Sequence, residues 1–483
     1  MSSISEHARL DPRRWVALAV LCAATFIIIL DGSIVFVAVP SMAKDLALTP
    51  SGVQWVLSSY LLSFGGLLLL GGRVADLLGR RRMFVLGAAL MAVSSLLCGL
   101  AWSGEVLIAA RVVEGASAAI MTPTALSILM ATFAEGRERN KALGVWSSAA
   151  GIGGTVGALL GGPLTTGLGW GWIFFVNIPV AAAVVVLSPL VLRESYDRQR
   201  ASTFDVAGAL TSTAALVGLV YLIVDAPQNG WTSGWTIGLG VVVLALLAGF
   251  VLIERRSAAP LLPLKYLRGK VFVGGNLVML TTGMAVNGGM GAIMTEYAQV
   301  VLGYSPVQFG LMFAVMTALT VIGSTLAGGP LVNRFGPRPV AVGGLVLIGL
   351  SCLNLTGISA TGSFVHDILL GMLLFGPGLG ASFTVGSIAG LAGVPAHDSG
   401  MASGLNTASF HIGGALGIAI LTTVAASAGG SGPAAMTAGF RSAYAVAISF
   451  AAVGVLAALV LLGRRRASAT ITSIGEERFR EAA

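Results

Sequence analysis

Fourteen long apolar segments recur along the sequence, and they limit the chain to a small set of folds. A helix needs about 20 apolar residues to cross a bilayer. Runs of Leu, Val, Ile and Ala favour helices over barrel strands, whose apolar residues alternate. Only 10% of the residues are charged, against about 25% in soluble domains. We therefore expect an all-α integral membrane protein with segments near residues 15–38, 52–71, 83–101, 106–127, 142–166, 172–192, 205–225, 235–254, 272–295, 307–328, 339–358, 367–390, 402–425 and 443–463.

Basic residues gather in every second joint between the apolar segments. Clusters such as Arg80–Arg82 and Arg255–Arg256 lie on one side, whereas the alternate joints hold little more than Lys44 and Arg441. Basic loops stay on the cytoplasmic side of a membrane, so both termini are predicted to be cytoplasmic in a multi-pass protein of the cell inner (plasma) membrane. This distribution accounts for the net charge of +8, which therefore indicates no nucleic-acid partner.

Two stretches of the sequence resemble each other. GGRVADLLGRRR, Gly71–Arg82, and GGPLVNRFGPRP, Gly328–Pro339, each follow one apolar segment and precede another. The first follows segment two and the second follows segment ten. This offset of eight segments corresponds to halves of six segments each with two further segments inserted between them. The predicted division is an N-terminal six-helix half at 1–195, two inserted helices and a linker at 196–258, a C-terminal six-helix half at 259–466 and a cytoplasmic tail at 467–483. Paired halves with a site between them are a common transporter plan.

Asp31 is an acid within the first apolar segment, in the stretch LDGSIVFVAVP. An ionisable side chain inside a membrane is costly and usually functional. Arg111 and Glu114 are three residues apart on one face of the fourth segment, at a depth similar to that of Asp31. Burial favours neutral carboxyl groups and a nearby arginine favours charged ones. The three groups are therefore expected to exchange a proton, with Arg111 orienting the acids, or else to form a static pair that only orders the helices.

The sequence contains no Walker loop, metal-ligand spacing or nucleophile–base motif. ATP-driven pumping and catalysis are therefore disfavoured, and no cofactor or metal is implied. The chain is not expected to be an enzyme.

Several motifs together resemble the major facilitator superfamily and, within it, the fourteen-span drug/proton antiporter family. The motifs occur in the family's order along nearly the whole chain: LDGSIVFVAVP from Leu30, GRVADLLGRRR from Gly72, RVVEGASAA from Arg111, WGWIFFVNIP from Trp170 and GMASGLNTASFHIGGALGIAI from Gly400. The chain departs from the family where Glu114 replaces a usual Gln, where Ala158 replaces a usual Pro after Gly157, and where Gly171 replaces a usual Arg.

The resemblance implies further roles. The loop residues Gly72, Asp76, Gly79, Arg80 and Arg81 would form a charge lock on a cytoplasmic gate; the alternative is that they only set the topology.

A second set of residues implied by the resemblance is the glycine stripe at Gly153, Gly157 and Gly161. It would face the other half of the chain and limit leak, and Gly413, Gly414 and Gly417 of the thirteenth segment would do the same on the other side. Plain helix packing is the alternative in both cases.

Two more ionisable groups are candidates for substrate binding. Glu296, near the outer end of the ninth segment, would contact a cationic substrate or simply reach the surface. His411, inside the thirteenth segment, could titrate near neutral pH, although a hydrogen-bonded core histidine is the preferred interpretation.

The functional prediction is a secondary active multidrug exporter that exchanges a small, amphipathic or lipophilic substrate for protons by alternating access, working as a monomer in the lipid bilayer. The alternatives are a proton-coupled or facilitated importer on the same fold and a membrane sensor that does not transport. Acids retained in the apolar segments favour transport over sensing, and the family motifs favour export over import.

Overall fold

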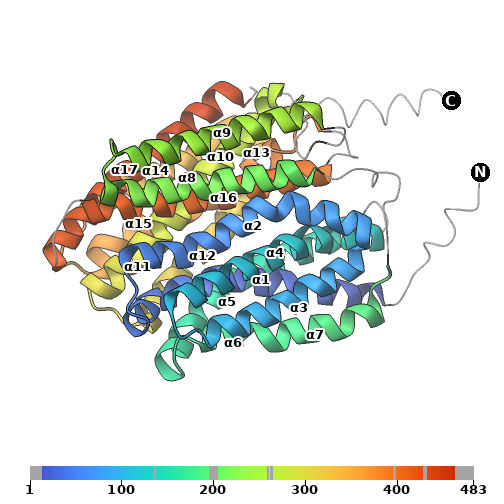
Figure 1. Cartoon of the computed structure of the whole chain (residues 1–483), viewed down its shortest axis with the longest axis horizontal. Helices are drawn as coiled ribbons and strands as arrows, with labels where there is room; N and C mark the ends of the chain where they lie inside the picture. The colour runs from blue at the N-terminus through green and yellow to red at the C-terminus, as the bar shows by residue number, and fades with distance from the viewer. Residues whose placement is uncertain are drawn as a thin grey trace, which may run out of the picture.

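A computed structural model describes residues 13–133, 137–194, 205–257, 260, 265–394, 399–427 and 432–462. Every regular element formed by these residues is a helix. The helices run side by side along the long axis of the molecule (Figure 1). The predicted tail at 467–483 lies outside the described residues.

The first half of the chain contributes seven helices, of which α6 is a single short turn. They are α1 (Arg14–Asp45), α2 (Pro50–Leu78), α3 (Arg80–Gly99), α4 (Gly104–Thr132), α5 (Arg137–Gly167), α6 (Trp172–Phe175) and α7 (Asn177–Val191). A hairpin of α8 (Val206–Asn229) and α9 (Gly234–Arg256) follows.

The second half is interrupted more often, because several of its helices contain wide π-helical turns. It comprises η1 (Tyr266–Arg268), α10 (Lys270–Gly283), η2 (Met284–Ile293), α11 (Met294–Glu296), η3 (Tyr297–Val301), α12 (Pro306–Leu326), η4 (Ala327–Leu331), α13 (Val332–Phe335), α14 (Pro337–Leu355), η5 (Phe364–Ile368), α15 (Leu369–Ala389), α16 (Ser399–Ser427) and α17 (Pro433–Leu461). The elements from α10 to η3 form one continuous span.

Twelve helical segments among the described residues are long and apolar enough to cross a membrane. The two other segments that the sequence predicts as spans correspond to α2 and α8. Each expected segment is therefore a helix, and most helices extend beyond their apolar core. For example, α1 continues to Asp45 where the sequence predicts an end near residue 38.

Polar side chains cap several of the helix starts. We call the end where α1 begins and α17 ends the basic end, because Arg80–Arg82 and Arg255–Arg256 lie there, and we call the opposite end the outer end. At the outer end, hydroxyl side chains accept hydrogen bonds from the first turn: Thr49 caps α2, Ser103 caps α4 and Ser305 forms a capping box on α12. These caps satisfy backbone N–H groups that a helix leaves unpaired.

The two halves pack their helices in the same pattern. In the first half α1 packs on α5, α2 on α4 and α3 on α7; in the second half α10 and η2 pack on α16, α12 on α15 and α14 on α17. The repeated loop turns at a glycine in both halves: Gly79 (φ +107°) and Gly336 (φ +84°) each join two helices in a conformation that favours glycine. The pairing of helices therefore follows the same order in the two parts of the chain.

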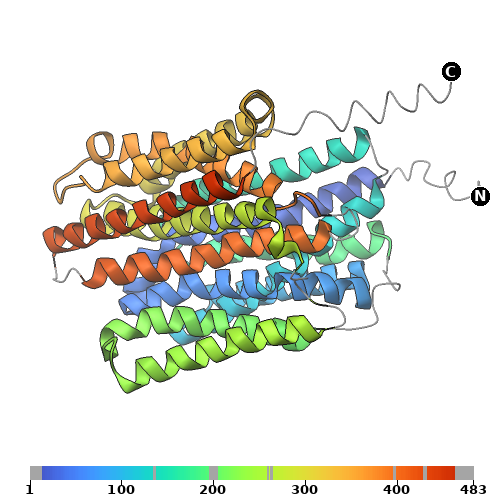
Figure 2. The ribbon, with the colours of Figure 1, turned by 90° about the horizontal axis from the view of Figure 1, so that it is seen from above.

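The halves meet along two helix pairs, α2 with α16 and α5 with α12. The α8–α9 hairpin lies at the rim of the bundle (Figure 2). Within it, α8 covers the seam between α2 and α16, where the Thr213 hydroxyl donates to the Gly66 carbonyl at 3.2 Å. By contrast α9 packs mainly on α8 and leaves most of its surface exposed.

Candidate functional site

The buried acid predicted in α1 lies in the interior of the first half. Asp31 is completely buried, and its Oδ1 accepts a hydrogen bond from Asn177 Nδ2 at 3.1 Å. Asn177 is the first residue of α7 and is also completely buried. The short turn α6 ends just before it, so the amide enters the bundle where α7 starts.

Arg111 joins both acids. Its Nη1 lies 2.7 Å from Asp31 Oδ2 and 2.8 Å from Glu114 Oε2. Arg111 and Glu114 project from the same face of α4 because they are three residues apart. All three side chains are at most 2% exposed. The structure therefore brings together the three ionisable groups that the sequence places at one depth.

Two side chains of α3 complete the surroundings of Glu114. Ser95 Oγ donates to Glu114 Oε1 at 2.6 Å, and the Cys98 thiol donates to Oε2 at 3.5 Å. Asn177 Nδ2 also lies 3.4 Å from Ser95 Oγ. A continuous polar network thus runs from α1 through α7 and α3 to α4, and both carboxyl groups have hydrogen-bond partners in addition to the arginine.

Aromatic rings flank the guanidinium. The Arg111 Cζ lies 4.2 Å from the centroid of the Tyr60 ring and 5.8 Å from that of Phe174. Its Nε donates to the Val56 carbonyl at 3.4 Å. Tyr60 is itself held by a hydrogen bond from its hydroxyl to the Ile28 carbonyl of α1. Cation–π contacts favour the charged guanidinium in a site without bulk water.

The charge balance of this site is uneven. With both acids ionised, two negative charges face the single positive charge of Arg111, so the site carries one net negative charge. A net charge in a water-poor interior is costly. Binding one proton on either carboxyl group would neutralise the site. The site therefore holds one more carboxyl group than its single arginine can balance.

Sequence reasoning missed four polar members of this network: Tyr60, Ser95, Cys98 and Asn177. Asn177 belongs to the stretch WGWIFFVNIP, so a polar residue in an apolar segment was a signal that could have found it. Cys98 is buried and contacts Glu114, but a lone cysteine in an apolar segment looks like any small core residue. Ser95 and Tyr60 carry no such signal, because serine and tyrosine are common in membrane helices.

The predicted loop is anchored within its own half in the described residues. The Arg81 backbone N–H donates to Glu194 Oε1 at 3.0 Å, and its Nη1 donates to the Leu192 carbonyl beyond α7 at 3.4 Å. Gly72 lies close to the Pro123 ring of α4, and Arg80 begins α3 directly after Gly79. The side chain of Asp76 lies outside the described part of the structure.

The glycine stripe of α5 faces α1 of the same half, and the expectation that it faces the other half is wrong. A Cβ on Gly153 would lie 2.6 Å from the Phe26 carbonyl oxygen, and one on Gly157 would lie 2.7 Å from that of Leu30. Gly161 is nearest to Val37 and Ile34 of α1. Because these glycines carry no side chain, the backbones of α5 and α1 can approach each other this closely.

The corresponding glycines of α16 behave in the same way. Gly413 packs on the Leu280 carbonyl and Gly417 on that of Met284, both within the second half. Gly414 differs because it lies between Asn287 of η2 and Leu61 of α2.

Other residues of α5 contact the second half, at the outer end of the bundle. A Cβ on Gly162 would lie 2.5 Å from the Cα of Val307, and one on Gly310 would lie 2.3 Å from the Ala158 carbonyl oxygen. Gln299 Nε2 donates to the Val37 carbonyl of α1 at 2.9 Å. These contacts hold the halves together at the outer end.

The two candidate substrate-binding residues, Glu296 and His411, lie on different helices and have different neighbours. Glu296 is half-buried in α11, which contacts α1 of the other half. His411 on α16 stacks on Phe64 of α2, with ring centroids 4.1 Å apart. Its Nδ1 has no hydrogen-bond partner among the described residues, so the expected hydrogen bond is absent from that nitrogen. Neither residue contacts the Asp31–Arg111–Glu114 site.

A membrane bundle of two similar halves, with a buried acid–arginine network in one of them, defines a membrane transporter rather than an enzyme. The family model of the Major Facilitator Superfamily matches residues 21–328 and 271–481. The chain belongs to this superfamily and is a multi-pass membrane protein, which in bacteria resides in the plasma membrane.

Curated relatives are resistance and export proteins. The chain is 38% identical to the puromycin resistance protein pur8 of Streptomyces alboniger over 459 residues, covering 92% of this chain and 90% of the relative. It is 37% identical to the cephamycin export protein CmcT of Amycolatopsis lactamdurans, covering 91% of each chain. The multidrug resistance protein Stp of Mycobacterium tuberculosis is 37% identical, covering 83% of this chain and 74% of the relative. These relatives agree with the drug/proton antiporter family.

Solved structures share the fold at low sequence identity. A bacterial homologue of the human lysosomal transporter Spinster, in an inward-facing and unoccupied conformation, has a TM-score of 0.64 at 19% identity and covers 95% of this chain and all of its own. A peptide transporter of the POT family in complex with sulfate has a TM-score of 0.67 at 16% identity, covering 92% of this chain and 94% of its own.

Proposed function

We propose that this protein is a secondary active exporter that releases small amphipathic or lipophilic compounds in exchange for protons. The observation that carries the proposal is the fully buried Asp31–Arg111–Glu114 network, in which two acids share one arginine. The proton-coupling residues would be Asp31 and Glu114, with Arg111 orienting both, since arginine does not release its proton in proteins.

The direction of transport and the class of substrate are inferred from the relatives. Two are named for resistance to puromycin or to multiple drugs, and one for cephamycin export. Export accounts for each of these names, whereas an importer of the same compounds would increase sensitivity. We therefore favour export over import.

Alternating access would proceed by rocking of the two six-helix halves, 1–195 and 259–466, about the seam that α8 covers. The contacts of Gly162, Gly310 and Gln299 between the halves support a conformation closed at the outer end. In this proposal α2 and α8 also cross the bilayer, which gives fourteen spans with both termini cytoplasmic. The loop from Gly72 to Arg81, Asp76 included, would then gate the basic end, and one chain would suffice for transport.

Substrate would bind between the halves. Glu296 and His411 are the candidate contacts, because each lies on a helix of the second half that touches the first half. A half-buried carboxylate at Glu296 would favour cationic substrates, and the apolar neighbours of His411 would favour aromatic ones.

The test is Asp31→Asn in proteoliposomes, with a pH-sensitive dye reporting proton movement when substrate is added. The variant keeps the side-chain volume but cannot ionise, so we expect substrate-induced proton movement to be lost while the protein remains folded. Asp45→Asn is the matched control, because Asp45 lies on the same helix in an exposed contact with Trp170. Full proton coupling in the Asp31→Asn protein would exclude Asp31 as the coupling residue.

A further inference from the structure

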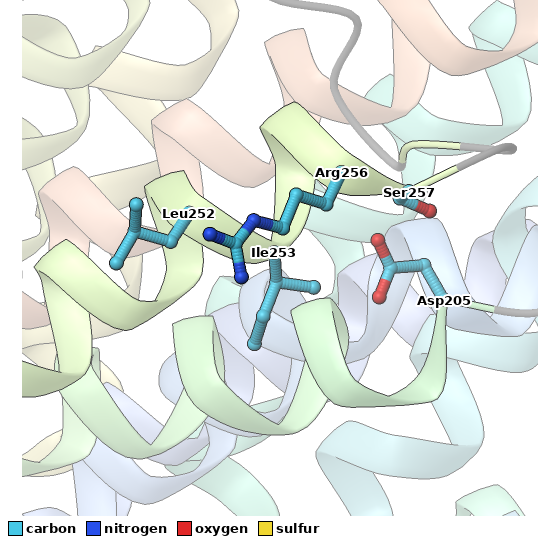
Figure 3. Close-up of a pocket in the computed structure, with 5 residues that line it drawn as sticks. All are labelled: Asp205, Leu252, Ile253, Arg256 and Ser257. Carbon is cyan, nitrogen blue, oxygen red and sulfur yellow. The ribbon is translucent and has the colours of Figure 1, made fainter.

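The inserted hairpin carries a small cavity of its own, at the basic end of the bundle. It has a volume of about 320 Å³ and is lined by Asp205, Leu252, Ile253, Arg256 and Ser257. Figure 3 shows the Asp205 carboxylate at one side of this space and the Arg256 guanidinium on the other side of Ile253. An acid and a base thus line one cavity without contacting each other.

Asp205 is a buried acid with one carboxylate oxygen that has no partner in the described part of the chain. It caps α8, with Oδ1 accepting from the Gly208 N–H at 2.6 Å. The residue is only 6% exposed, and its Oδ2 has no hydrogen-bond partner in the described part of the chain. A buried carboxylate oxygen without a partner is costly. A donor from outside the chain would remove that cost.

Arg256 supplies the opposite charge. It belongs to the last turn of α9, and its side chain extends along Leu252 and Ile253 (Figure 3). No ion pair is formed by Arg256 within the described residues. A guanidinium in this position is suited to bind a phosphate. A ligand that fills the cavity should therefore combine an ammonium group, for Asp205, with a phosphate, for Arg256.

The surroundings indicate that this ligand is a lipid. The cavity lies where α8 begins and α9 ends, at the boundary between apolar helix and basic end. From Leu252, which is 52% exposed, a stripe of exposed apolar side chains continues along α9 through Leu244 and Val241. Acyl chains would follow this stripe into the bilayer. A soluble phosphoamine would leave the stripe uncovered.

We propose that the Asp205–Arg256 cavity binds the headgroup of phosphatidylethanolamine, with the ammonium on Asp205 Oδ2 and the phosphate on Arg256. Phosphatidylcholine should bind poorly because its quaternary nitrogen has no N–H to donate. The lipid would hold the start of α8 to the end of α9 and so fix the hairpin at the seam between the halves.

The experiment measures lipid retention by the purified full-length protein, using native mass spectrometry after reconstitution in equal amounts of phosphatidylethanolamine and phosphatidylcholine. We expect the natural protein to retain the ethanolamine lipid about tenfold better, an effect of the size given by one charge-assisted hydrogen bond. Asp205→Asn and Arg256→Gln should each reduce this preference to near unity. Asparagine is a good helix cap, so Asp205→Asn removes the charge and keeps the fold.

Arg255→Gln is the matched control, because Arg255 is adjacent and exposed but does not line the cavity. Equal loss of preference in this variant would show a general charge effect and overturn the proposal. Lipids with one or two N-methyl groups keep an N–H, so retention should fall sharply only at the third methyl group. A gradual decline, or displacement of the lipid by soluble glycerophosphoethanolamine, would also overturn it. Because no transport is measured, the result is independent of the proposed export function.

Discussion

Glu114 determines the charge of the buried network, because it provides the second acid beside a single arginine. Glu114→Gln removes one negative charge but keeps acceptor and donor atoms for Arg111 and Ser95, so the fold should persist. With Asp31 and Arg111 then balanced, the site no longer needs a proton for neutrality. We expect the number of protons exchanged per substrate to fall and the pH profile of efflux to change. Proton-to-substrate ratios in proteoliposomes provide the measurement.

A static ion pair would give a different result for the same variant. If Arg111 keeps Glu114 permanently ionised, then stoichiometry, pH profile and substrate range should all remain those of the natural protein. Ser95→Ala is a useful companion variant, because it removes the 2.6 Å hydrogen bond to Glu114 without removing a charge. Unchanged transport in both variants would assign Glu114 a structural role only.

The ionisable members of the site were predictable from sequence, whereas their uncharged partners were not. Asp31, Arg111 and Glu114 are conspicuous because charges are rare in apolar segments. Asn177 and Ser95 act through contacts between helices that are distant in sequence, 82 residues apart in the case of this pair. Such contacts depend on how α3 and α7 pack, and helix periodicity alone does not specify this packing.

At the scale of whole helices, the packing of α5 on α1 depends on bare backbone. In Gly157→Ala the new Cβ would lie 2.2 Å from Ser33 Oγ and 2.7 Å from the Leu30 carbonyl oxygen. The helices must separate to accept it, and such overpacking costs about 1–3 kcal/mol. We expect a lower thermal unfolding temperature in detergent, measured by the fluorescence of the tryptophans.

The control for this variant lies on the same helix. A Cβ on Gly144 would have no other heavy atom within 4 Å, so Gly144→Ala should not lower the unfolding temperature and should raise helix propensity slightly. Equal unfolding temperatures for the two alanine variants would mean that α5 and α1 are not held by close contact at Gly157.

The helices were predictable as elements, but their irregularities were not. Each apolar segment corresponds to a helix because length and composition suffice to identify a span. The π-helical turns of η2 and η3 were not anticipated, since the stretch MAVNGGMGAI has no sequence signal that separates π from α turns. The wide turns accompany close contacts of Gly288 with α16 and of Gly291 with Phe36 of α1, which only the assembled bundle creates.

For the whole molecule, the contacts at the outer end should set the balance between conformations. In Gly310→Ala the new Cβ would lie 2.3 Å from the Ala158 carbonyl oxygen, across the two halves. A strain of about 1–3 kcal/mol would shift a two-state equilibrium by about 5- to 150-fold. We expect a larger distance between spin labels at Leu168 and Val300, which are exposed near the outer ends of the two halves.

Gly343→Ala tests whether the effect is specific to this interface. Gly343 lies inside α14, and a Cβ there would meet nothing within 4 Å. Its spin-label distances should match those of the natural protein. A Gly310→Ala protein with the same distances as this control would show that the outer contacts do not hold the halves closed.

The repeated pairing of helices could be expected from the sequence, because the repeated loop follows the second helix of each set. The positive φ of Gly79 and Gly336 explains why glycine occurs in both copies. The direction in which the α5 glycines face was not predictable, since a stripe of small residues fits equally well against a helix of either half.

Every arginine–carboxylate pair that is fully buried in the described residues belongs to the first half. Under the proposed function, the proton-coupling residues and the candidate substrate contacts Glu296 and His411 lie in different halves of the chain, so the two halves would be free to evolve separately. A hybrid transporter that joins this first half to the second half of an antibiotic-exporting relative should keep the ionic behaviour of one parent and acquire the resistance spectrum of the other. Gene recombination near the inserted hairpin would then be a simple route by which new resistances arise.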